Sequence, residues 1–243
     1  MSMINQFLAA TNYHRSWHDI LCTALESMSM TYLEQLSTNP AWLPGMPRVF
    51  HAFNQPLDQV QHVLIGESPY PRAKSANGYA FWDQAITQLW SPSGLSKEAN
   101  RATSFRNILK MLLVAEGHLA PDQVDQASIS RVDKHGLVMT NQAFFENLLK
   151  QGFLLLNASL SLGSQKTVRE EAKAWLPFFH AILLGIVKYR PNAHFLLFGK
   201  IALQVQDWLP SSQILIAEHP YNLSFIHNPE VIRYFSSLKL LKQ

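Results

Sequence analysis

Two kinds of hydrophobic spacing alternate along the chain. Short runs that are apolar almost throughout cover residues 61–66, 153–157, 193–198 and 213–217, and turn-forming or polar residues bound each run. Runs of this length and composition are typical of buried strands. Longer segments, in which apolar residues recur every three or four positions, predict helices over residues 5–36, 104–113, 142–150, 170–187, 200–208 and 229–241. Ser104 is predicted to cap the helix that follows it.

The order of these elements predicts the fold class. Strands that are apolar throughout and alternate with helices form parallel sheets that are covered on both faces. We therefore predict a three-layer α/β/α fold with a central four-stranded parallel sheet, in one domain over residues 1–243 without internal repeats. Ligands bind beyond the carboxyl ends of such strands. We expect the residues that follow the strands, 66–70, 157–159, 199–200 and 218–220, to meet at one edge of the sheet.

Composition narrows the class of protein further. The chain has 243 residues, of which 47% are hydrophobic and 15% charged, which suits a folded domain with a large core. Its apolar runs are too short to span a bilayer and its first residues lack a signal peptide, so we expect a cytoplasmic protein without a membrane partner. The single cysteine, Cys22, excludes a disulfide framework, a cysteine zinc site and a protein-held iron–sulfur cluster. We expect no metal and no cofactor.

Net charge adds a weak indication of the partner. The formal charge is +3 and the pI is about 9.0. A mild basic excess is compatible with binding to a polyanion, but many cytosolic proteins share it.

Four short motifs lie at the ends of the predicted strands. They read GESPYPR at residues 66–72, GYAF at 78–81, LLLN at 154–157 and HPYNLS at 219–224. In order and spacing they resemble the motifs GQDPYHG, GLxFS, LLLN and HPSPLS of the Ung-type uracil-DNA glycosylases. The resemblance extends from about Trp17 to the end of the chain. It implies a uracil-DNA glycosylase-like fold, a monomer, and hydrolysis of the N-glycosidic bond of a nucleotide that is flipped out of DNA.

The resemblance also implies roles for individual side chains. Phe81 matches the ring that stacks on the base, and Asn157 matches the amide that reads its edge. Tyr70 matches the ring that excludes a methyl group at C5 of the base. His219 matches the histidine that bonds the departing base, and Leu223 the wedge that fills the gap left in the duplex.

Contacts with the DNA backbone are implied at a second set of positions. Ser104 and Ser224 fall on motif positions, and Pro69 lies in the loop that matches the catalytic loop. Further candidates for phosphate contacts or for a basic face are Ser164, Lys166, Arg169, Lys200, Arg72, Lys74, Arg101 and Arg106.

One departure from the motifs affects the chemistry directly. Ser68 stands where the family has the aspartate that activates water, and a serine hydroxyl orients water but is not a base near neutral pH. Glu67 supplies a carboxylate one residue away, although neighbouring side chains at a strand end point in different directions. The candidate catalytic residues are therefore His219, Ser68 and Glu67. Other altered positions are Pro71, Ala102, Thr103, Arg169 and Glu170.

Three functions remain open at this point. The first is a glycosylase that releases uracil from DNA, slowly because Ser68 replaces the aspartate. The second is a non-catalytic relative that binds uracil-containing or damaged DNA, or a protein partner such as an inhibitor or a replication protein. The third is a glycosylase for another modified base, with Pro71 and Trp82 reshaping the pocket.

Overall fold

The computed structural model describes residues 3–39 and 41–243, which form two compact units. Unit 1 takes in the described residues of Met1–Asp83, together with Gly152–Leu197 and Ile201–Ile214. Unit 2 consists of Gln84–Gln151, Phe198–Lys200 and Leu215–Gln243. The single domain expected over residues 1–243 stays a prediction.

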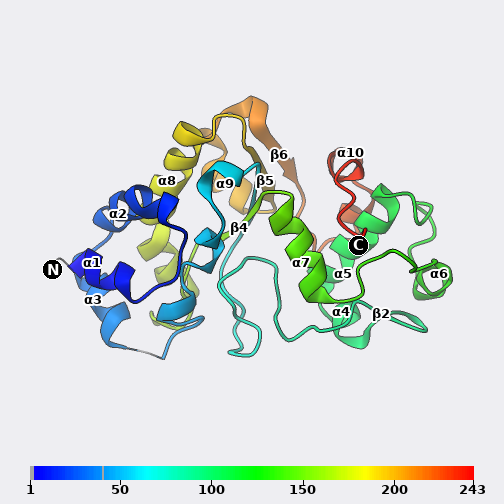
Figure 1. Ribbon diagram of the computed structural model, residues 1–243, viewed down its shortest axis with the longest axis horizontal. Helices are drawn as coiled ribbons and strands as arrows, with labels where there is room; N and C mark the ends of the chain where they lie inside the picture. The colour runs from blue at the N-terminus through cyan, green and yellow to red at the C-terminus, as the bar shows by residue number, and fades with distance from the viewer. Residues whose placement is uncertain (1–2, 40) are drawn as a thin grey trace. The chain divides into compact units, whose positions relative to one another are not determined.

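The predicted four-stranded sheet is present (Figure 1). Its strands are β1 (His62–Gly66), β4 (Phe153–Asn157), β5 (His194–Phe198) and β6 (Ile214–Ala217), in the order β4-β1-β5-β6. β1 pairs in parallel with β4 and with β5, so that Leu64 stands opposite Leu155 and Leu196. Successive residues of β4 are all buried, which means that both faces of the sheet are covered. The α/β fold class is confirmed.

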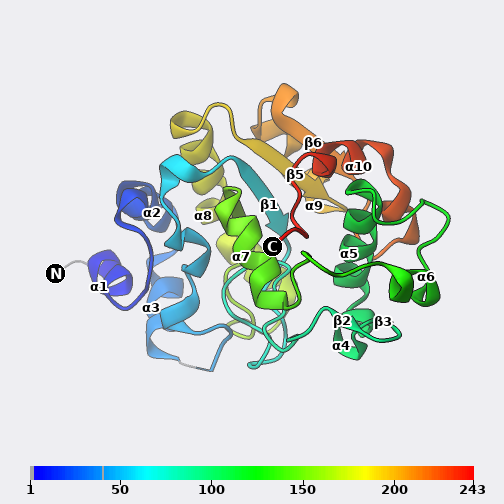
Figure 2. The same ribbon diagram turned by 45° about the vertical axis from the view of Figure 1, so that its right-hand side comes forward.

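The helices of unit 1 cover an aromatic core. In Figure 2, α2 lies along α8, and the two helices pack together. Trp175 and Phe178 on the buried face of α8 meet ring to edge, and Phe50 stacks on Phe178 with ring centroids 5.6 Å apart. The elements of this unit outside the sheet are α1 (Met3–Ala9), η1 (Arg15–Trp17), α2 (His18–Glu26), α3 (Met30–Thr38), η2 (Met46–Arg48), η3 (His51–Asn54), η4 (Leu57–Gln59), α8 (Val168–Tyr189), α9 (Ile201–Val205), η5 (Gln206–Trp208) and η6 (Ser211–Gln213).

Helix α8 begins two residues before the predicted start because its first turn is capped. The Thr167 hydroxyl accepts a bond from the Glu170 N–H at 3.2 Å, and the Glu170 carboxylate accepts from the Thr167 N–H at 3.0 Å. This reciprocal pair is a capping box, which satisfies two backbone donors at the start of the helix. The departure from the family motif at Glu170 therefore has a structural role here.

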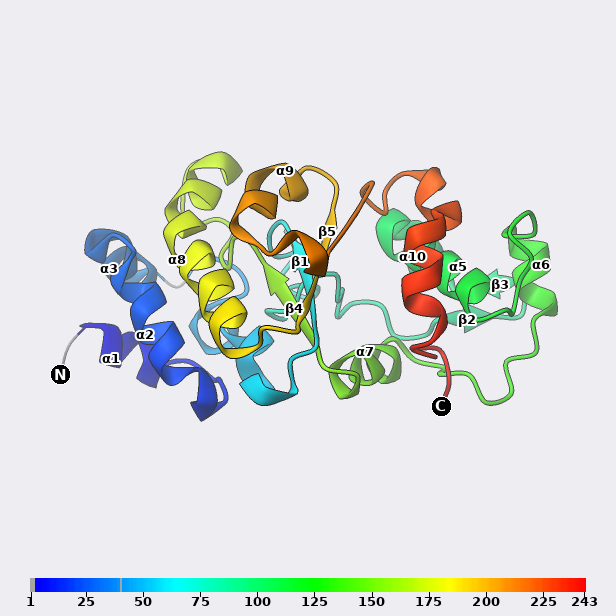
Figure 3. The same cartoon turned by 90° about the horizontal axis from the view of Figure 1, so that it is seen from above.

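Unit 2 is built around α5, which contacts α10 and η7 (Figure 3). Phe105 on α5 packs against Phe144 and Phe145, with ring centroids 5.8 and 5.7 Å apart. The elements of this unit are β2 (Trp90–Ser91), β3 (Gly94–Leu95), α4 (Lys97–Arg101), α5 (Thr103–Ala115), α6 (Gln126–Arg131), α7 (Asn141–Lys150), η7 (Leu223–His227) and α10 (Pro229–Ser236).

Two predictions about unit 2 are wrong in detail. Ser104 does not cap α5, because the helix already begins at Thr103 and Ala102 occupies the cap position without a side-chain bond. Helix α10 ends at Ser236 rather than at residue 241, and Lys239 beyond it has a φ of +50°, which a continuing helix excludes. The hairpin of β2 and β3 and the short helices α4 and α6 were not predicted.

No helix among the described residues combines the length and apolarity needed to cross a membrane. Within those same residues, no three His, Cys, Asp or Glu side chains gather as a metal site would require.

Candidate active site

The ends of β1 and β4 lie side by side in unit 1. Gly66, the last residue of β1, pairs with Asn157, the last residue of β4. The pairing continues into the following loops, where the Ala158 N–H donates to the Gly66 carbonyl at 2.9 Å and the Ser159 N–H to the Glu67 carbonyl at 3.0 Å. The loop that carries Ser68 and the loop that follows Asn157 are therefore held together by backbone bonds as well as by the strands.

Gly66 allows two candidate base-binding side chains to approach each other. A Cβ at this position would lie 2.6 Å from Asn157 Oδ1 and 3.6 Å from Cε2 of Phe81. Any larger residue would displace the Asn157 amide, which is only 3% exposed. The absence of a side chain thus keeps an amide and an aromatic ring together at this strand end, as the motifs predicted.

Backbone bonds hold Phe81 in place. The Ala80 N–H donates to the Leu155 carbonyl of β4 at 3.0 Å, and the Tyr70 hydroxyl donates to the Phe81 carbonyl at 3.1 Å. Phe81 itself has a φ of +63°, a conformation that residues other than glycine adopt rarely and that costs about 1–3 kcal/mol. The surrounding bonds offset this strain, and the half-buried ring is kept beside Asn157.

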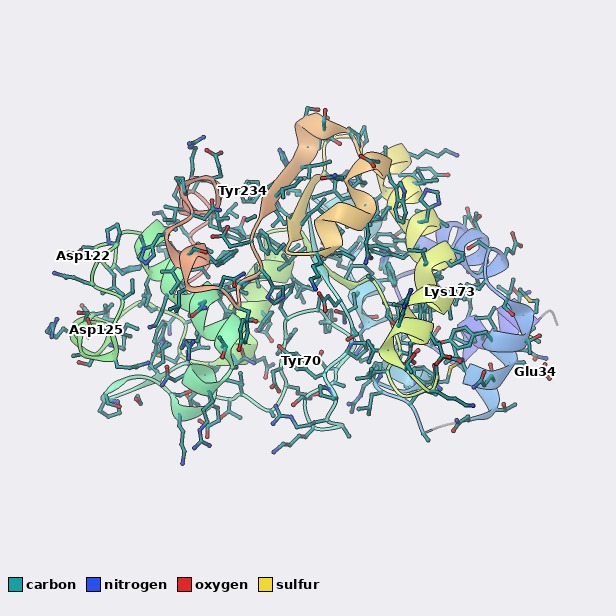
Figure 4. All side chains as sticks on the ribbon, turned by 180° about the vertical axis from the view of Figure 1, so that it is seen from behind. Glu34, Tyr70, Asp122, Asp125, Lys173 and Tyr234 are labelled. Carbon is teal, nitrogen blue, oxygen red and sulfur yellow. The ribbon has the colours of Figure 1, made fainter. Side chains whose placement is uncertain are left out.

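Tyr70 lies in the segment between β1 and Phe81 (Figure 4). Burial raises the pKa of the Tyr70 hydroxyl, the Asp83 carboxylate raises it further, and Arg72 opposes the shift. Arg72 Nη2 bonds the buried Asp83 at 3.0 Å. Gly78, with a φ of +92°, passes so close to the Arg48 carbonyl that a Cβ would clash with it. The Tyr70 hydroxyl is therefore neutral and donates to the Phe81 carbonyl.

The residues at the predicted water site differ in exposure. Glu67 is exposed, Ser68 is half-buried and Pro69 is buried. Glu67 contributes its carbonyl to the bond with Ser159 while its carboxylate faces solvent. This loop therefore offers the Ser68 hydroxyl and, one residue before it, the solvent-facing Glu67 carboxylate.

A buried carboxylate shapes the loop that follows Asn157. Glu171 on α8 is 1% exposed and accepts bonds from the Ser161 hydroxyl at 2.7 Å, the Gly163 N–H at 2.8 Å and the Ser164 N–H at 3.0 Å. The Ser164 hydroxyl is also bonded to Tyr32 at 2.7 Å. Ser164 is thus buried, and its hydroxyl and N–H are hydrogen-bonded within the protein, which contradicts its predicted contact with phosphate.

Unit 2 carries His219 with a defined proton arrangement. The backbone N–H of Tyr221 donates to His219 Nδ1 at 3.1 Å. An accepting Nδ1 holds no proton, so the neutral ring carries its proton on Nε2 and presents a donor there. Gly199 has a φ of +77°, and a Cβ at this position would lie 2.8 Å from Cβ of His219. Glycine is therefore required where the end of β5 passes the histidine.

Asn107 anchors the loop that contains His219, and the sequence reasoning missed it. Its side chain is fully buried in α5, and Nδ2 donates to the Pro220 carbonyl at 2.8 Å, with the carbonyls of Tyr221 and Asn222 at 3.4 Å. The position was detectable because Asn107 shares a helix face with the buried apolar residues Met111 and Val114.

Three further predicted DNA contacts, Leu223, Ser104 and Ser224, lie on the same unit as His219. Leu223 is 67% exposed at the start of η7, and Ser104 is half-buried in the first turn of α5. Ser224 is exposed and hydrogen-bonds Glu218, which also accepts from Asn228 Nδ2 at 2.7 Å. Burial raises the pKa of Glu218, but these hydrogen bonds outweigh it and leave the pKa below its usual value.

Comparison with known proteins identifies the family. A family model described as the uracil DNA glycosylase superfamily matches residues 53–238, well over half of the chain. The chain belongs to this superfamily. Within the family, the uracil-DNA glycosylase of Wolinella succinogenes is 28% identical over 230 residues, covering 91% of this chain and 86% of that protein. The uracil-DNA glycosylase of Dichelobacter nodosus is 30% identical over 184 residues, covering 74% and 67%.

Solved structures of the family agree with the fold. The wild-type UNG crystal structure from Nitratifractor salsuginis matches with a TM-score of 0.91 and 37% identity, covering 98% of this chain and 96% of that chain. The structure of mimivirus UNG Y322L in complex with UGI matches with a TM-score of 0.58 and 16% identity, covering 92% and 74%, which is a likeness of fold. The predicted membership of the uracil-DNA glycosylase family is confirmed.

Proposed function

We propose that this protein removes uracil from DNA by hydrolysing the N-glycosidic bond of a flipped-out nucleotide. The observation that carries the proposal is the approach of Asn157 and Phe81 to Gly66 in a chain of the uracil DNA glycosylase superfamily. A buried amide beside an aromatic ring is the combination that reads one edge of a base while stacking on its face.

Recognition of uracil follows from the chemistry of three side chains. The Asn157 amide offers one donor and one acceptor group, which match the N3–H and O4 of uracil and oppose the reversed pattern of cytosine. A buried polar group left unpaired by the wrong base gives strong discrimination. Phe81 stacks on the base, and the Tyr70 ring occupies the space beside C5 where thymine carries a methyl group.

Bond cleavage separates charge. The C1′–N1 bond breaks, its electron pair leaves with the base, and the sugar becomes cation-like. His219 Nε2–H, placed as the donor by the bond at Nδ1, stabilises the negative charge that develops on uracil O2. Water then adds to C1′ and loses a proton, and the uracil anion takes up a proton, which leaves free uracil and an abasic site.

The water site departs from the usual arrangement. Ser68 orients the attacking water, and the proton of that water is lost to solvent, with the exposed Glu67 one residue away as the nearest carboxylate in the sequence. Help from a general base is worth about 10²- to 10⁴-fold, so turnover is slow relative to an enzyme with aspartate at position 68.

The DNA is held by residues of the flanking loops. In this proposal Leu223 fills the gap left by the flipped base, and Ser104, Ser224 and Pro69 contact the backbone. We also propose a protein inhibitor as a partner, prompted by the mimivirus neighbour, which is a complex with UGI. A replication protein is the other partner in this proposal. Action as a cytoplasmic monomer belongs to the same proposal.

The test is release of uracil from single-stranded, U·A and U·G oligonucleotides. The wild type is expected to release uracil, and Asn157→Asp and His219→Ala to abolish release, because each removes a group that the reaction needs. Ser68→Asp is expected to accelerate the wild-type reaction. DNA binding without release by the wild type would instead indicate a binding relative. Full activity of both Asn157→Asp and His219→Ala would refute the assignment of the site.

A further inference from the structure

The loop that contains His219 carries an exposed aromatic ring with no role in the reaction described above. Tyr221 is 67% exposed, as exposed as Leu223 two residues later. The motif that this loop resembles has serine at the position of Tyr221, so the ring is a feature of this chain. A large exposed ring beside a catalytic histidine requires an explanation.

The backbone beneath this ring is held in place. The Tyr221 N–H is bonded to His219 Nδ1 at 3.1 Å, and the Asn222 N–H donates to the His219 carbonyl at 2.9 Å. Nδ2 of the buried Asn107, on α5, donates a hydrogen bond to the Pro220 carbonyl. Tyrosine has only two side-chain torsions, so a ring on such a loop loses little conformational entropy when it binds a flat partner.

The position of the ring indicates what this partner is. His219 acts on the flipped uracil, and Tyr221 follows it by two residues on the same constrained loop. The strand that carries the uracil must therefore pass close to the Tyr221 ring. Every base offers a flat face, and stacking on aromatic side chains is independent of base identity.

We propose that Tyr221 stacks on a base next to the uracil, on the same DNA strand, and so holds that strand while Leu223 fills the gap. This inference rests on the proposed function. It makes Tyr221 a DNA-binding residue that acts on single-stranded as well as on duplex substrate, since its partner does not belong to the opposite strand.

The first experiment measures affinity without turnover. A labelled single-stranded oligonucleotide carries 2′-fluoro-2′-deoxyuridine, in which the fluorine suppresses cleavage, and its Kd is measured by fluorescence anisotropy. Tyr221→Ala is expected to weaken binding by about 10-fold, the size of one stacked base. Tyr221→Phe is expected to stay within about 2-fold of the wild type, because the ring is kept. Tyr189→Ala, at a 52% exposed tyrosine on α8, is the matched control and is expected to bind like the wild type.

The second experiment locates the stacked base. Each base that flanks the fluorinated uridine is replaced in turn by an abasic tetrahydrofuran unit. The wild type is expected to lose about 10-fold in affinity at one position, and Tyr221→Ala to lose nothing further there, because both changes remove the same contact. In turnover assays the Tyr221→Ala loss is expected mainly in KM, since the backbone bond to His219 Nδ1 remains.

Three results would overturn the inference: wild-type affinity in Tyr221→Ala, an equal loss in Tyr221→Phe, or the same abasic penalties in the wild type and in Tyr221→Ala. An equal loss in Tyr221→Phe would assign the contact to the hydroxyl, as a bond to phosphate. These binding comparisons decide the role of Tyr221 even if the wild type releases no uracil, a result that would refute the proposed function by itself.

Discussion

Replacing Asn107 with alanine tests whether the loop of His219 is positioned from α5. The substitution removes the Nδ2 donor, which lies 2.8 Å from the Pro220 carbonyl and 3.4 Å from the carbonyls of Tyr221 and Asn222. Asn107 is fully buried, so the Pro220 carbonyl loses its donor in a place where water does not easily replace it. A buried acceptor left without a partner costs about 1–3 kcal/mol.

The expected magnitude follows from that loss. A destabilisation of about 2 kcal/mol lowers Tm by about 4–8 °C for a chain of this size, measured by scanning calorimetry. The second effect is on the reaction, because the loop carries His219 and a displacement of about 1 Å at a reacting group can cost about 10²-fold in rate. We therefore expect kcat for uracil release to fall by at least about 10-fold in Asn107→Ala, at temperatures where the variant is fully folded.

Asn147→Ala is the matched control. Asn147 lies on α7 in the same unit, and its Nδ2 also donates to backbone carbonyls, those of Leu240 at 3.0 Å and Lys242 at 2.7 Å. It anchors the end of the chain rather than the loop of His219, so we expect Asn147→Ala to lower Tm while kcat stays at the wild-type value. Equal kcat values in Asn107→Ala and Asn147→Ala would refute the reasoning, because the anchor would then be purely structural.

Two further predictions concern Gly66 and His62. Gly66→Ala is expected to abolish most uracil release, because its methyl group would lie 2.6 Å from Asn157 Oδ1. Gly117→Ala strains the backbone at a φ of +82° but has nothing within 4 Å of its Cβ, so the folded variant is expected to keep the wild-type initial rate. Burial, with the charge of His194, lowers the pKa of His62 from 6.5 to about 4. As the pH falls, His62 is therefore protonated in the unfolded chain before it is protonated in the folded one. The stability that neutral His62 contributes above pH 6.5 is lost as the pH falls towards 4. The free energy of unfolding is measured with urea at pH 7 and at pH 5. Between these pH values the wild type is expected to lose at most about 2 kcal/mol more than His62→Phe, and less where water screens the ring. Equal losses in the two proteins would contradict the assignment.

The strands were predictable because each is apolar almost throughout. Strand β4 has no exposed residue, so its pattern could not be confused with that of a surface strand. The long helix α8 was predicted to within two residues at each end because its buried stripe of Trp175, Phe178 and Ile182 follows helical spacing. The hydrophobic pattern of a helix or strand is clearest in the sequence where the element buries a whole face.

The parts that escaped prediction depend on individual contacts. Strands β2 and β3 have two residues each, too few to show a period of two. Asn107 and Glu171 both interrupt apolar helix faces, and only the structure shows that Asn107 binds the backbone of the loop of His219 and Glu171 that of the loop after Asn157. The end of α10 depends on the positive φ of Lys239, for which lysine gives no warning in the sequence.

The glycines at the ends of β1 and β5 leave room for candidate site residues, whatever residue stands at position 68. Gly66 leaves room for Asn157 and Phe81, and Gly199 leaves room for His219, because a Cβ would come within 3 Å of a site atom in each case. These contacts depend on the backbone and do not involve the side chain at position 68. In the proposed mechanism, serine in place of aspartate at position 68 therefore removes one contribution to the rate and leaves base reading and leaving-group stabilisation in place. Because Ser68→Asp changes only that contribution, its effect on uracil release measures directly how much a carboxylate at position 68 adds to the rate.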